Sequence, residues 1–433
     1  MGGGIWKIKS SVSFRAKRKC RAVSLVANSR NLFLLMRVVC RVLLATMLGS
    51  VFLIPLQLPA SAQTRNGEPQ KISEARRSFP LDKFYEVPTP LPAGKPGELI
   101  RSEEFDDYDL PPDILAIRIL YHSRSANGND VAVSGVVLYP DKQAPRMGWP
   151  LLAWAHALNG VAHQCAPSLA KNLQHGPYLS MYVSLGYAVV ATDYAGLGTA
   201  FRNAFSDVQS NAKDLIDSVP AARAALTQLD SRWVAVGIGE GGPAAAGVAE
   251  LESDMHDSGY LGSIVISGLD DPRDHYQSSG PENFETPLFL VYGIQTVYPQ
   301  FNPKDVLTDK GLSLYPEVEK SCVDPGRQSP SGILKANWTS NRIVKQYFAR
   351  NTLGQPAQRP MLIISSALDP SVPITRTAQT VSKMCKEGDA IQFERYPESE
   401  MSDLFGDSVG DQISWMKARF ANRPAANNCS AKP

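Results

Sequence analysis

A glycine-rich turn between an apolar segment and an alanine-rich segment constrains the fold of this 433-residue chain more than any other feature. Residues 233–237 are apolar and few enough to form a buried strand. Pro243 then opens a segment of helical composition, and proline is favoured in the first turn of a helix. Between them, residues 237–241 read Gly-Ile-Gly-Glu-Gly, so a sharp strand–helix bend would direct backbone N–H groups and Gly239 at one point. The sequence therefore predicts a strand–turn–helix unit with a site at its bend.

Strand-like and helix-like segments alternate through most of the chain. Two strands around an Asn-Gly turn predict a hairpin over residues 114–140. Further strands are predicted at 149–156, 186–194, 233–237, 261–268, 360–370 and 390–397, and helices at 177–185, 207–229, 374–385 and 405–420. This alternation predicts a mostly parallel sheet with helices on both faces, and the hairpin would form its antiparallel edge.

The same pattern divides the chain into five regions. Residues 270–359 interrupt the strand–helix alternation with many Pro, Gly and Asn, and are interpreted as a cap that controls access to a site. The predicted regions are a leader (1–62), an extended N-terminal arm (63–112), the first part of the core (113–269), the cap or lid (270–359) and the second part of the core (360–433).

The first 62 residues have the pattern of a secretory signal peptide. They contain ten Lys or Arg and no acidic residue, then an apolar run at 42–58 and Ala-Ser-Ala at 60–62. Cleavage is expected after residue 62, and a start at Met36 would give a leader of ordinary length. The short run contains Pro55, which disfavours a membrane anchor. We therefore expect a secreted or periplasmic protein with no membrane span after cleavage.

Removal of this leader changes both the charge and the cysteine content. Loss of ten positive charges takes the net charge from +2 to −8, which gives no indication of nucleic-acid binding. Four cysteines remain, and in an exported protein they suggest two disulfides. Of the three possible pairings we predict Cys165–Cys322 and Cys385–Cys429; the alternative is four unpaired thiols.

Five features follow one another in an order that resembles a known family. They are the strings at 154–168 (WAHALNGVAHQCAPS) and 189–199 (VVATDYAGLGT), the turn at 237–241, the predicted cap, and the string at 367–373 (ALDPSVP). Together they resemble the secretory lipase family, a capped branch of the α/β-hydrolases that acts on triacylglycerols and other esters. The resemblance covers roughly residues 84–420 and implies an α/β-hydrolase fold with an inserted cap.

The resemblance also implies a nucleophile, an acid and a histidine in that order. Asp369 matches the acid, although its alternative role is a turn residue before Pro370. The nucleophile position, serine in the G-x-S-x-G turn of this fold, is Gly239, and the histidine position corresponds by length to Met401. The six histidines all precede Asp369: His122, His156, His163, His175, His256 and His275. The usual triad cannot form from this sequence.

The oxyanion hole implied by the resemblance is altered as well. Its donors would be the Glu240 N–H and N–H groups near His156 and Ala157. Ala157 adds a methyl group where the family usually has glycine, and a charged Glu240 would oppose a developing oxyanion. Loss of the serine or the histidine alone reduces turnover on the order of 10⁶-fold in a well-studied serine protease.

Two other interpretations of these segments are weaker. Gly237, Gly239 and Gly242 fit a dinucleotide fingerprint, but the nearest acid at the next strand end, Asp270, comes late. His156 and its neighbouring His and Cys residues lack the spacing of a zinc site, and a packed histidine is favoured. We therefore expect neither a cofactor nor a metal.

These observations lead to one principal hypothesis and two alternatives. The principal hypothesis is a secreted, lipase-like pseudoenzyme that binds an acyl ester or lipid under its cap. The first alternative is an active lipase or carboxylesterase with a non-standard catalytic set, such as Glu240 and Asp369. The second is an exported structural or interaction protein that binds no ligand.

Overall fold

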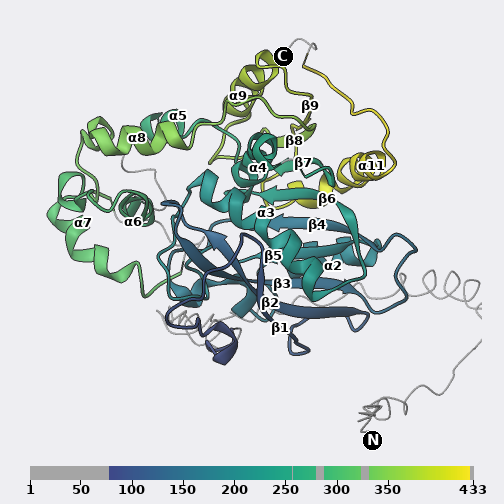
Figure 1. Ribbon diagram of the computed structural model, residues 1–433. Coiled ribbons are helices and arrows are strands. Elements are labelled where there is room, and N and C mark those ends of the chain that lie inside the picture. The colour runs from purple at the N-terminus through teal and green to yellow at the C-terminus, as the bar shows by residue number, and fades with distance from the viewer. Residues whose placement is uncertain (1–77, 256, 279–286, 323–330, 430–433) are drawn as a thin grey trace, which may run out of the picture. The chain divides into compact units, whose positions relative to one another are not determined.

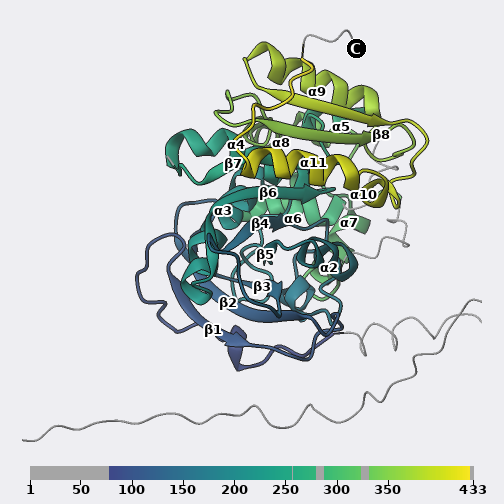
Figure 2. The same ribbon diagram turned by 90° about the vertical axis from the view of Figure 1, so that its right-hand side faces the viewer.

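One mixed sheet organises the residues described by the computed structural model, which are 78–255, 257–278, 287–322 and 331–429. The predicted leader and the start of the predicted arm lie outside the described residues. Within them the sheet has nine strands in the order β1-β2-β3-β5-β4-β6-β7-β8-β9. Figures 1 and 2 show this sheet in two views. The strands are β1 (Leu99–Glu104), β2 (Ile114–Arg124), β3 (Asp130–Pro140), β4 (Trp149–Ala155), β5 (Ala188–Thr192), β6 (Leu229–Ile238), β7 (Tyr260–Ile266), β8 (Met361–Ser366) and β9 (Ile391–Tyr396).

The pairing of the strands confirms the predicted α/β fold class. The neighbours β5, β4, β6, β7, β8 and β9 pair in parallel, whereas β1, β2, β3 and β5 pair antiparallel. Figure 2 shows the strands following one another from β1 at the bottom to β8 near the top. Because parallel strands run in one direction, their carboxyl ends meet at one edge of the sheet, where ligands bind in open α/β folds.

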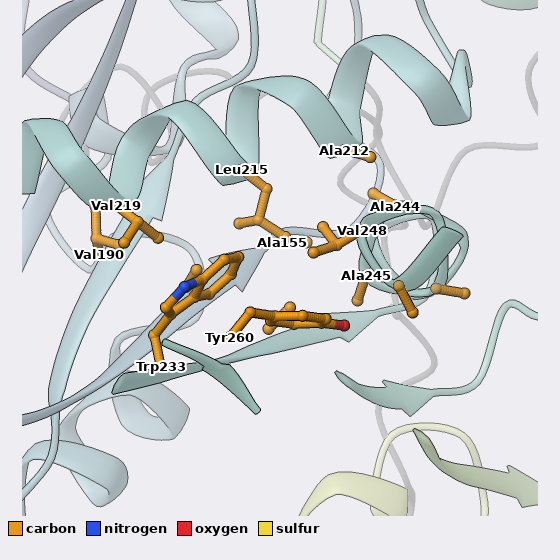
Figure 3. Packing of buried hydrophobic residues seen from close by; sticks show 14 of the residues in the cluster. Ala155, Val190, Ala212, Leu215, Val219, Trp233, Ala244, Ala245, Val248 and Tyr260 are labelled. Atoms are coloured by element: carbon orange, nitrogen blue, oxygen red, sulfur yellow. The ribbon is translucent and has the colours of Figure 1, made fainter. Parts of the chain in front are cut away.

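Helices cover both faces of the sheet because successive strand residues point to opposite sides. Trp233 and Ala235 of β6 belong to one apolar cluster, and Val234 and Val236 belong to the other. The first cluster includes α3 (Val208–Ala225), α4 (Gly241–Met255) and α9 (Ile374–Lys386). The second includes α2 (Gly176–Ser184), α10 (Leu404–Asp407) and α11 (Val409–Phe420). Figure 3 shows Trp233 and Tyr260 packed beneath side chains of α3 and α4.

The residues between β7 and β8 form a helical unit with its own apolar cluster. Its helices are α5 (Pro272–Ser278), α6 (Pro287–Val297), α7 (Asp309–Leu314) and α8 (Arg342–Arg350). Leu290, Ile294, Trp338 and Phe348 are among the buried members of this cluster. Figure 1 shows α6, α7 and α8 gathered beside the sheet rather than across its face. We refer to residues 270–359 as the cap.

Three predicted elements differ in extent from those observed. The predicted arm contains β1, which pairs with β2, so the hairpin of β2 and β3 lies one strand in from the edge. The polar sequence of β1, with its last three residues exposed, is typical of an edge strand and gives little hydrophobic signal. The helix predicted to reach residue 229 ends at Ala225, because Leu229 already pairs with Trp149. The last predicted helix is interrupted at Ser408, whose hydroxyl donates to the Leu404 carbonyl at 2.6 Å.

Both predicted disulfides are confirmed. Cys165 and Cys322 are bonded with their Cα atoms 5.4 Å apart, which links the loop after β4 to the cap. Cys385 and Cys429 are bonded with a Cα separation of 5.5 Å, which fixes the carboxyl-terminal segment to α9.

The Cys385–Cys429 bond is expected to stabilise the folded chain by restricting its unfolded state. The bond closes a loop with a sequence separation of 44 residues. A Cys385→Ser/Cys429→Ser variant should therefore lose about 2–4 kcal/mol in the free energy of unfolding. Equilibrium urea denaturation measures this loss, and Lys386→Ser, an exposed change at the same helix end, serves as the control. Equal midpoints for the natural and double-variant proteins would contradict the prediction.

Candidate functional site

The predicted strand–turn–helix bend is present, with Gly239 at its centre. Residue 239 lies between β6 and α4, with a φ angle of +56°, a value that non-glycine residues adopt infrequently. Its N–H donates to the Ile266 carbonyl at 3.0 Å, and its carbonyl accepts from the Gly242 N–H at 2.9 Å. A side chain at Gly241 is excluded, because its Cβ would lie 2.1 Å from the Ala155 carbonyl oxygen. The bend is therefore fixed against the ends of β4 and β7.

The structure brings Gly239, Ala157 and Met401 together. A Cβ built on Gly239 would lie 3.3 Å from the Ala157 Cβ and 4.0 Å from the Met401 Cε. The first distance is tight and the second is ordinary van der Waals contact. A side chain at residue 239 would thus contact the side chain that the sequence assigns to the histidine position. No serine hydroxyl and no imidazole occupies these two places.

Asp369 is buried in the loop after β8 and already has hydrogen-bond donors. One carboxylate oxygen, Oδ2, accepts from the Ser267 hydroxyl at 2.5 Å. The other, Oδ1, accepts from the backbone N–H groups of Ser371 at 2.8 Å and Val372 at 3.1 Å. Ser267 directly follows β7 and has a φ angle of +60°, so its hydroxyl contacts the acid from the neighbouring strand end. Ser267 could not be predicted from the sequence, since a serine after a strand gives no specific signal.

Several hydrogen bonds and ring contacts hold the loop that carries Met401. The Ser366 hydroxyl at the end of β8 donates to the Ser399 carbonyl. On the other side, the Tyr178 hydroxyl donates to the Ser402 carbonyl at 3.4 Å, and the Tyr178 ring stacks on Phe405 at 3.9 Å between centroids. These contacts fix the position of the loop over the bend.

Two exposed apolar side chains accompany this arrangement. Met401 is 39% exposed and Leu368, next to Asp369, is 53% exposed. Exposed large apolar residues at the carboxyl edge of a parallel sheet are suited to contact an apolar ligand.

His156 has the environment of a packed histidine, the role that the sequence favoured. It is 3% exposed, and its ring lies 4.3 Å from the Tyr194 ring. Burial lowers the pKa of His156 to about 4, so the imidazole is neutral at physiological pH. Its ring nitrogens face the Ala157 carbonyl at 2.6 Å and the Asp193 carbonyl at 3.2 Å. His156 therefore shapes the loop after β4.

Glu240 is half-buried and its charge differs from the sequence-based expectation. Burial raises the pKa of Glu240 to about 7, so the side chain is only partly ionised at neutral pH. Its Oε1 accepts a hydrogen bond from the Ser206 hydroxyl at 2.7 Å. The full negative charge expected beside the oxyanion position is therefore reduced, because burial disfavours the ionised carboxylate.

The raised pKa of Glu240 predicts a pH-dependent contribution to stability. Its pKa in the folded protein, about 7, exceeds the ordinary glutamate value, so folding favours the protonated form. This contribution is fully present below the pKa that Glu240 has in the unfolded protein, and it is lost as the pH rises through its pKa in the folded protein. Glu240→Gln should therefore lose less stability than the natural protein between pH 5 and pH 8.

Urea denaturation at both pH values measures this difference, with Glu398→Gln as the exposed control. Burial also raises the pKa values of four other carboxyl groups, those of Asp193, Asp214, Asp217 and Glu250. Both proteins should therefore be less stable at pH 8 than at pH 5, and the natural protein should show the larger loss. Identical pH dependence of the natural protein and Glu240→Gln would contradict the assignment to Glu240.

A separate cavity of about 340 Å³ lies between the β2–β3 turn, residues 195–204, the start of α3 and α6. Its lining includes Asn127, Phe201, Asp214 and Thr296, and does not include the residues of the bend. Over the described parts of residues 78–429, no group of three or more His, Cys, Asp or Glu side chains is placed to hold a metal ion. No helix in the described part of the chain is long and apolar enough to cross a membrane.

Two lipases are similar to this chain in sequence. The chain is 23% identical over 396 residues to a probable inactive lipase of Mycobacterium tuberculosis, covering 84% of this chain and 88% of that protein. It is 24% identical over 408 residues to lipase 6 of Candida albicans, covering 81% and 83%. No family model matches the chain.

Solved structures show the same fold. The closed state of Candida antarctica lipase A superposes with a TM-score of 0.67 at 18% identity, covering 81% of this chain and 89% of the lipase. The cell-wall-degrading esterase LipA of Xanthomonas oryzae superposes with a TM-score of 0.60 at 20% identity, covering 76% and 98%. The arrangement of strands and helices is therefore that of lipase and esterase structures.

Proposed function

We propose that this chain is an exported, lipase-like protein that binds an acyl ester or another lipid beneath its cap without Ser–His–Asp hydrolysis. The fold of lipase structures and the similarity to a probable inactive lipase support this proposal. The pattern of residues 1–62 supports export to the cell exterior or the periplasm, with cleavage after residue 62.

One observation carries the proposal. The bend and the loop after β9 meet at Gly239 and Met401, the two residues that the resemblance assigns to the positions of the nucleophile and the base. Glycine cannot attack a carbonyl and methionine cannot accept a proton at neutral pH. The exposed Met401 and Leu368 add apolar surface at the same place, which favours an acyl ligand.

An active lipase or carboxylesterase that uses Glu240 and Asp369 together is less well supported. Glu240 is hydrogen-bonded to Ser206, whereas Asp369 is hydrogen-bonded to Ser267 and two backbone N–H groups. The two carboxylates thus have separate partners. A structural protein without a ligand would not require the exposed apolar side chains beside the bend.

The test measures sustained turnover and binding separately. Full-length protein, expressed with its leader and purified after export, is assayed with p-nitrophenyl esters of short to long acyl chains. Binding of a pyrene-labelled acylglycerol is followed by fluorescence. Binding without turnover above a heat-denatured control supports the proposal. Turnover that Asp369→Asn and Glu240→Gln both abolish would replace it with the active-enzyme alternative, and absence of binding would overturn it.

Introducing a charge at Met401 is expected to weaken this binding at least tenfold. Met401→Glu would place a carboxylate against an apolar acyl chain, and burial of an unpaired charge is strongly unfavourable. Met147→Glu is the matched control, because Met147 is 65% exposed and precedes β4, at the opposite edge of the parallel strands. Equal loss of affinity in both variants would show that the ligand does not bind at the bend.

A further inference from the structure

A serine hydroxyl and a carboxylate meet directly beside the bend. The Ser206 Oγ donates to the Glu240 Oε1 at 2.7 Å, which is within the reach of a nucleophile and its base. Both residues are half-buried. Glu240 is also the residue whose N–H follows the nucleophile position, where this fold places an oxyanion donor. The pair therefore adjoins the place where a bound ester would lie.

The chain around Ser206 is strained and held on both sides. Ser206 has a φ angle of +57°, a conformation that costs energy for a non-glycine residue and often occurs at functional sites. The preceding Phe205 carbonyl accepts a hydrogen bond from the Tyr347 hydroxyl of the cap. The following Asp207 forms an ion pair with Arg350 of α8 at 2.7 Å. These neighbours fix the Ser206 hydroxyl against Glu240.

Glu240 is suited to accept the proton of the Ser206 hydroxyl. A serine hydroxyl is a weak nucleophile until a base accepts its proton, and such a base acts best when its pKa is near the working pH. Burial raises the pKa of Glu240 to about 7, which meets this requirement. Asp369 differs in its partners, because its carboxylate accepts hydrogen bonds from the Ser267 hydroxyl and from the N–H groups of Ser371 and Val372.

We propose that Ser206 and Glu240 form an acylation site for activated carboxylic esters bound beneath the cap. In the acylation step a bond forms between the Ser206 Oγ and the ester carbonyl carbon, and the bond from that carbon to the alcohol oxygen breaks. The hydroxyl proton passes to Glu240 and then to the departing alkoxide, which leaves as an alcohol. The inference rests on the proposed function, because it requires the ester to bind beside the bend. One carboxylate replaces a His–Asp pair, so slow, largely stoichiometric acylation is expected.

The experiment locates the acyl group. The exported full-length protein is incubated with p-nitrophenyl butyrate, and in parallel with a fluorophosphonate, and its peptides are examined by mass spectrometry. We expect one adduct, on Ser206, and p-nitrophenol release close to one equivalent. Ser206→Gly should remove the adduct, and it should fold because glycine adopts the φ angle of +57° without steric cost. Ser402→Ala, an exposed serine of the nearby loop, should retain it.

Glu240→Gln tests the base. The amide still accepts the hydrogen bond from Ser206 but cannot take its proton, so the acylation rate should fall at least about 10²-fold. In the natural protein this rate should rise with pH through about 7, as the Glu240 carboxylate loses its proton. The other titratable groups near Glu240 are Tyr194, Tyr276 and Tyr347, and burial raises the pKa of each. The charged groups that act on Tyr276 and Tyr347 are Asp207, Asp270 and Arg350.

The outcomes separate this inference from the proposed function. Retained binding of the pyrene-labelled acylglycerol with no adduct, or with an adduct that persists in Ser206→Gly, overturns the acylation site alone. An unchanged rate in Glu240→Gln does the same. If the natural protein does not bind the pyrene-labelled acylglycerol, the proposed function is overturned as well.

Discussion

The variant Gly239→Ser/Met401→His/Ala157→Gly is expected to hydrolyse short-chain esters at least about 10³-fold faster than the natural protein. Removal of the serine or the histidine from a working triad costs on the order of 10⁶-fold in turnover, so partial restoration leaves room for a gain of this size. The scaffold for both side chains is present, since a side chain at residue 239 would contact Met401 at about 4.0 Å. Steady-state kinetics with p-nitrophenyl butyrate measures the gain.

Ala157 is included in the variant for a steric reason. A Cβ at residue 239 would lie 3.3 Å from the Ala157 Cβ, tighter than an ordinary contact, so Gly239→Ser/Met401→His alone should gain less. A further substitution next to Asp369 should increase the activity of the variant again. Ser267 occupies the Oδ2 of Asp369 at 2.5 Å, and Ser267→Gly would release that oxygen for the new imidazole. Residue 267 has a φ angle of +60°, which glycine adopts without cost.

The control replaces the nucleophile without its hydroxyl. Gly239→Ala/Met401→His/Ala157→Gly has the same crowding and the same imidazole, and it should remain at the level of the natural protein. A gain of less than tenfold in the serine variant, with acylglycerol binding retained, would show that the site lacks the geometry for catalysis. Equal activity in the serine and alanine variants would assign the hydrolysis to another group.

The sequence predicted the sheet and the convergence at the bend because each depends on local patterns. Apolar runs separated by helical segments specify a parallel sheet, and its carboxyl ends then meet at one edge. Met401 was assigned to the histidine position by counting from the preceding strand, and its Cε lies 4.0 Å from a Cβ built on Gly239; the role of the position stays a prediction. β1 was not predicted as a strand, because its polar edge sequence carries no alternation of apolar residues.

The polar partners at the site could not be predicted for a different physical reason. Ser206 and Glu240 are 34 residues apart, and Ser267 and Asp369 are 102 residues apart. A hydrogen bond over such a separation depends on the packing of whole elements, whereas serine occurs in many loops without a role. The charge of Glu240 was misjudged because it depends on burial, which a single sequence position does not reveal.

Replacing Arg350 with methionine is expected to cost about 3–5 kcal/mol in the free energy of unfolding, because it leaves a buried charge without its partner. The Asp207 side chain is completely buried, and its carboxylate accepts from the Arg350 guanidinium at 2.7 Å and 3.1 Å. The same carboxylate caps α3 through the Ser210 N–H at 2.9 Å. Equilibrium urea unfolding measures the loss, and Asp207→Asn/Arg350→Met should recover part of it by removing the charge.

Lys320→Met provides the control within the cap. Lys320 pairs with Glu317 at 3.0 Å, but both side chains are more than half exposed, so this change should cost at most about 1 kcal/mol. Equal losses in Lys320→Met and Arg350→Met would contradict a special role for the buried pair. Since Asp207 directly follows Ser206, Arg350→Met should also slow acylation of Ser206 under conditions where the variant remains folded. Loss of stability with an unchanged acylation rate would mean that Arg350 anchors the cap without positioning the serine.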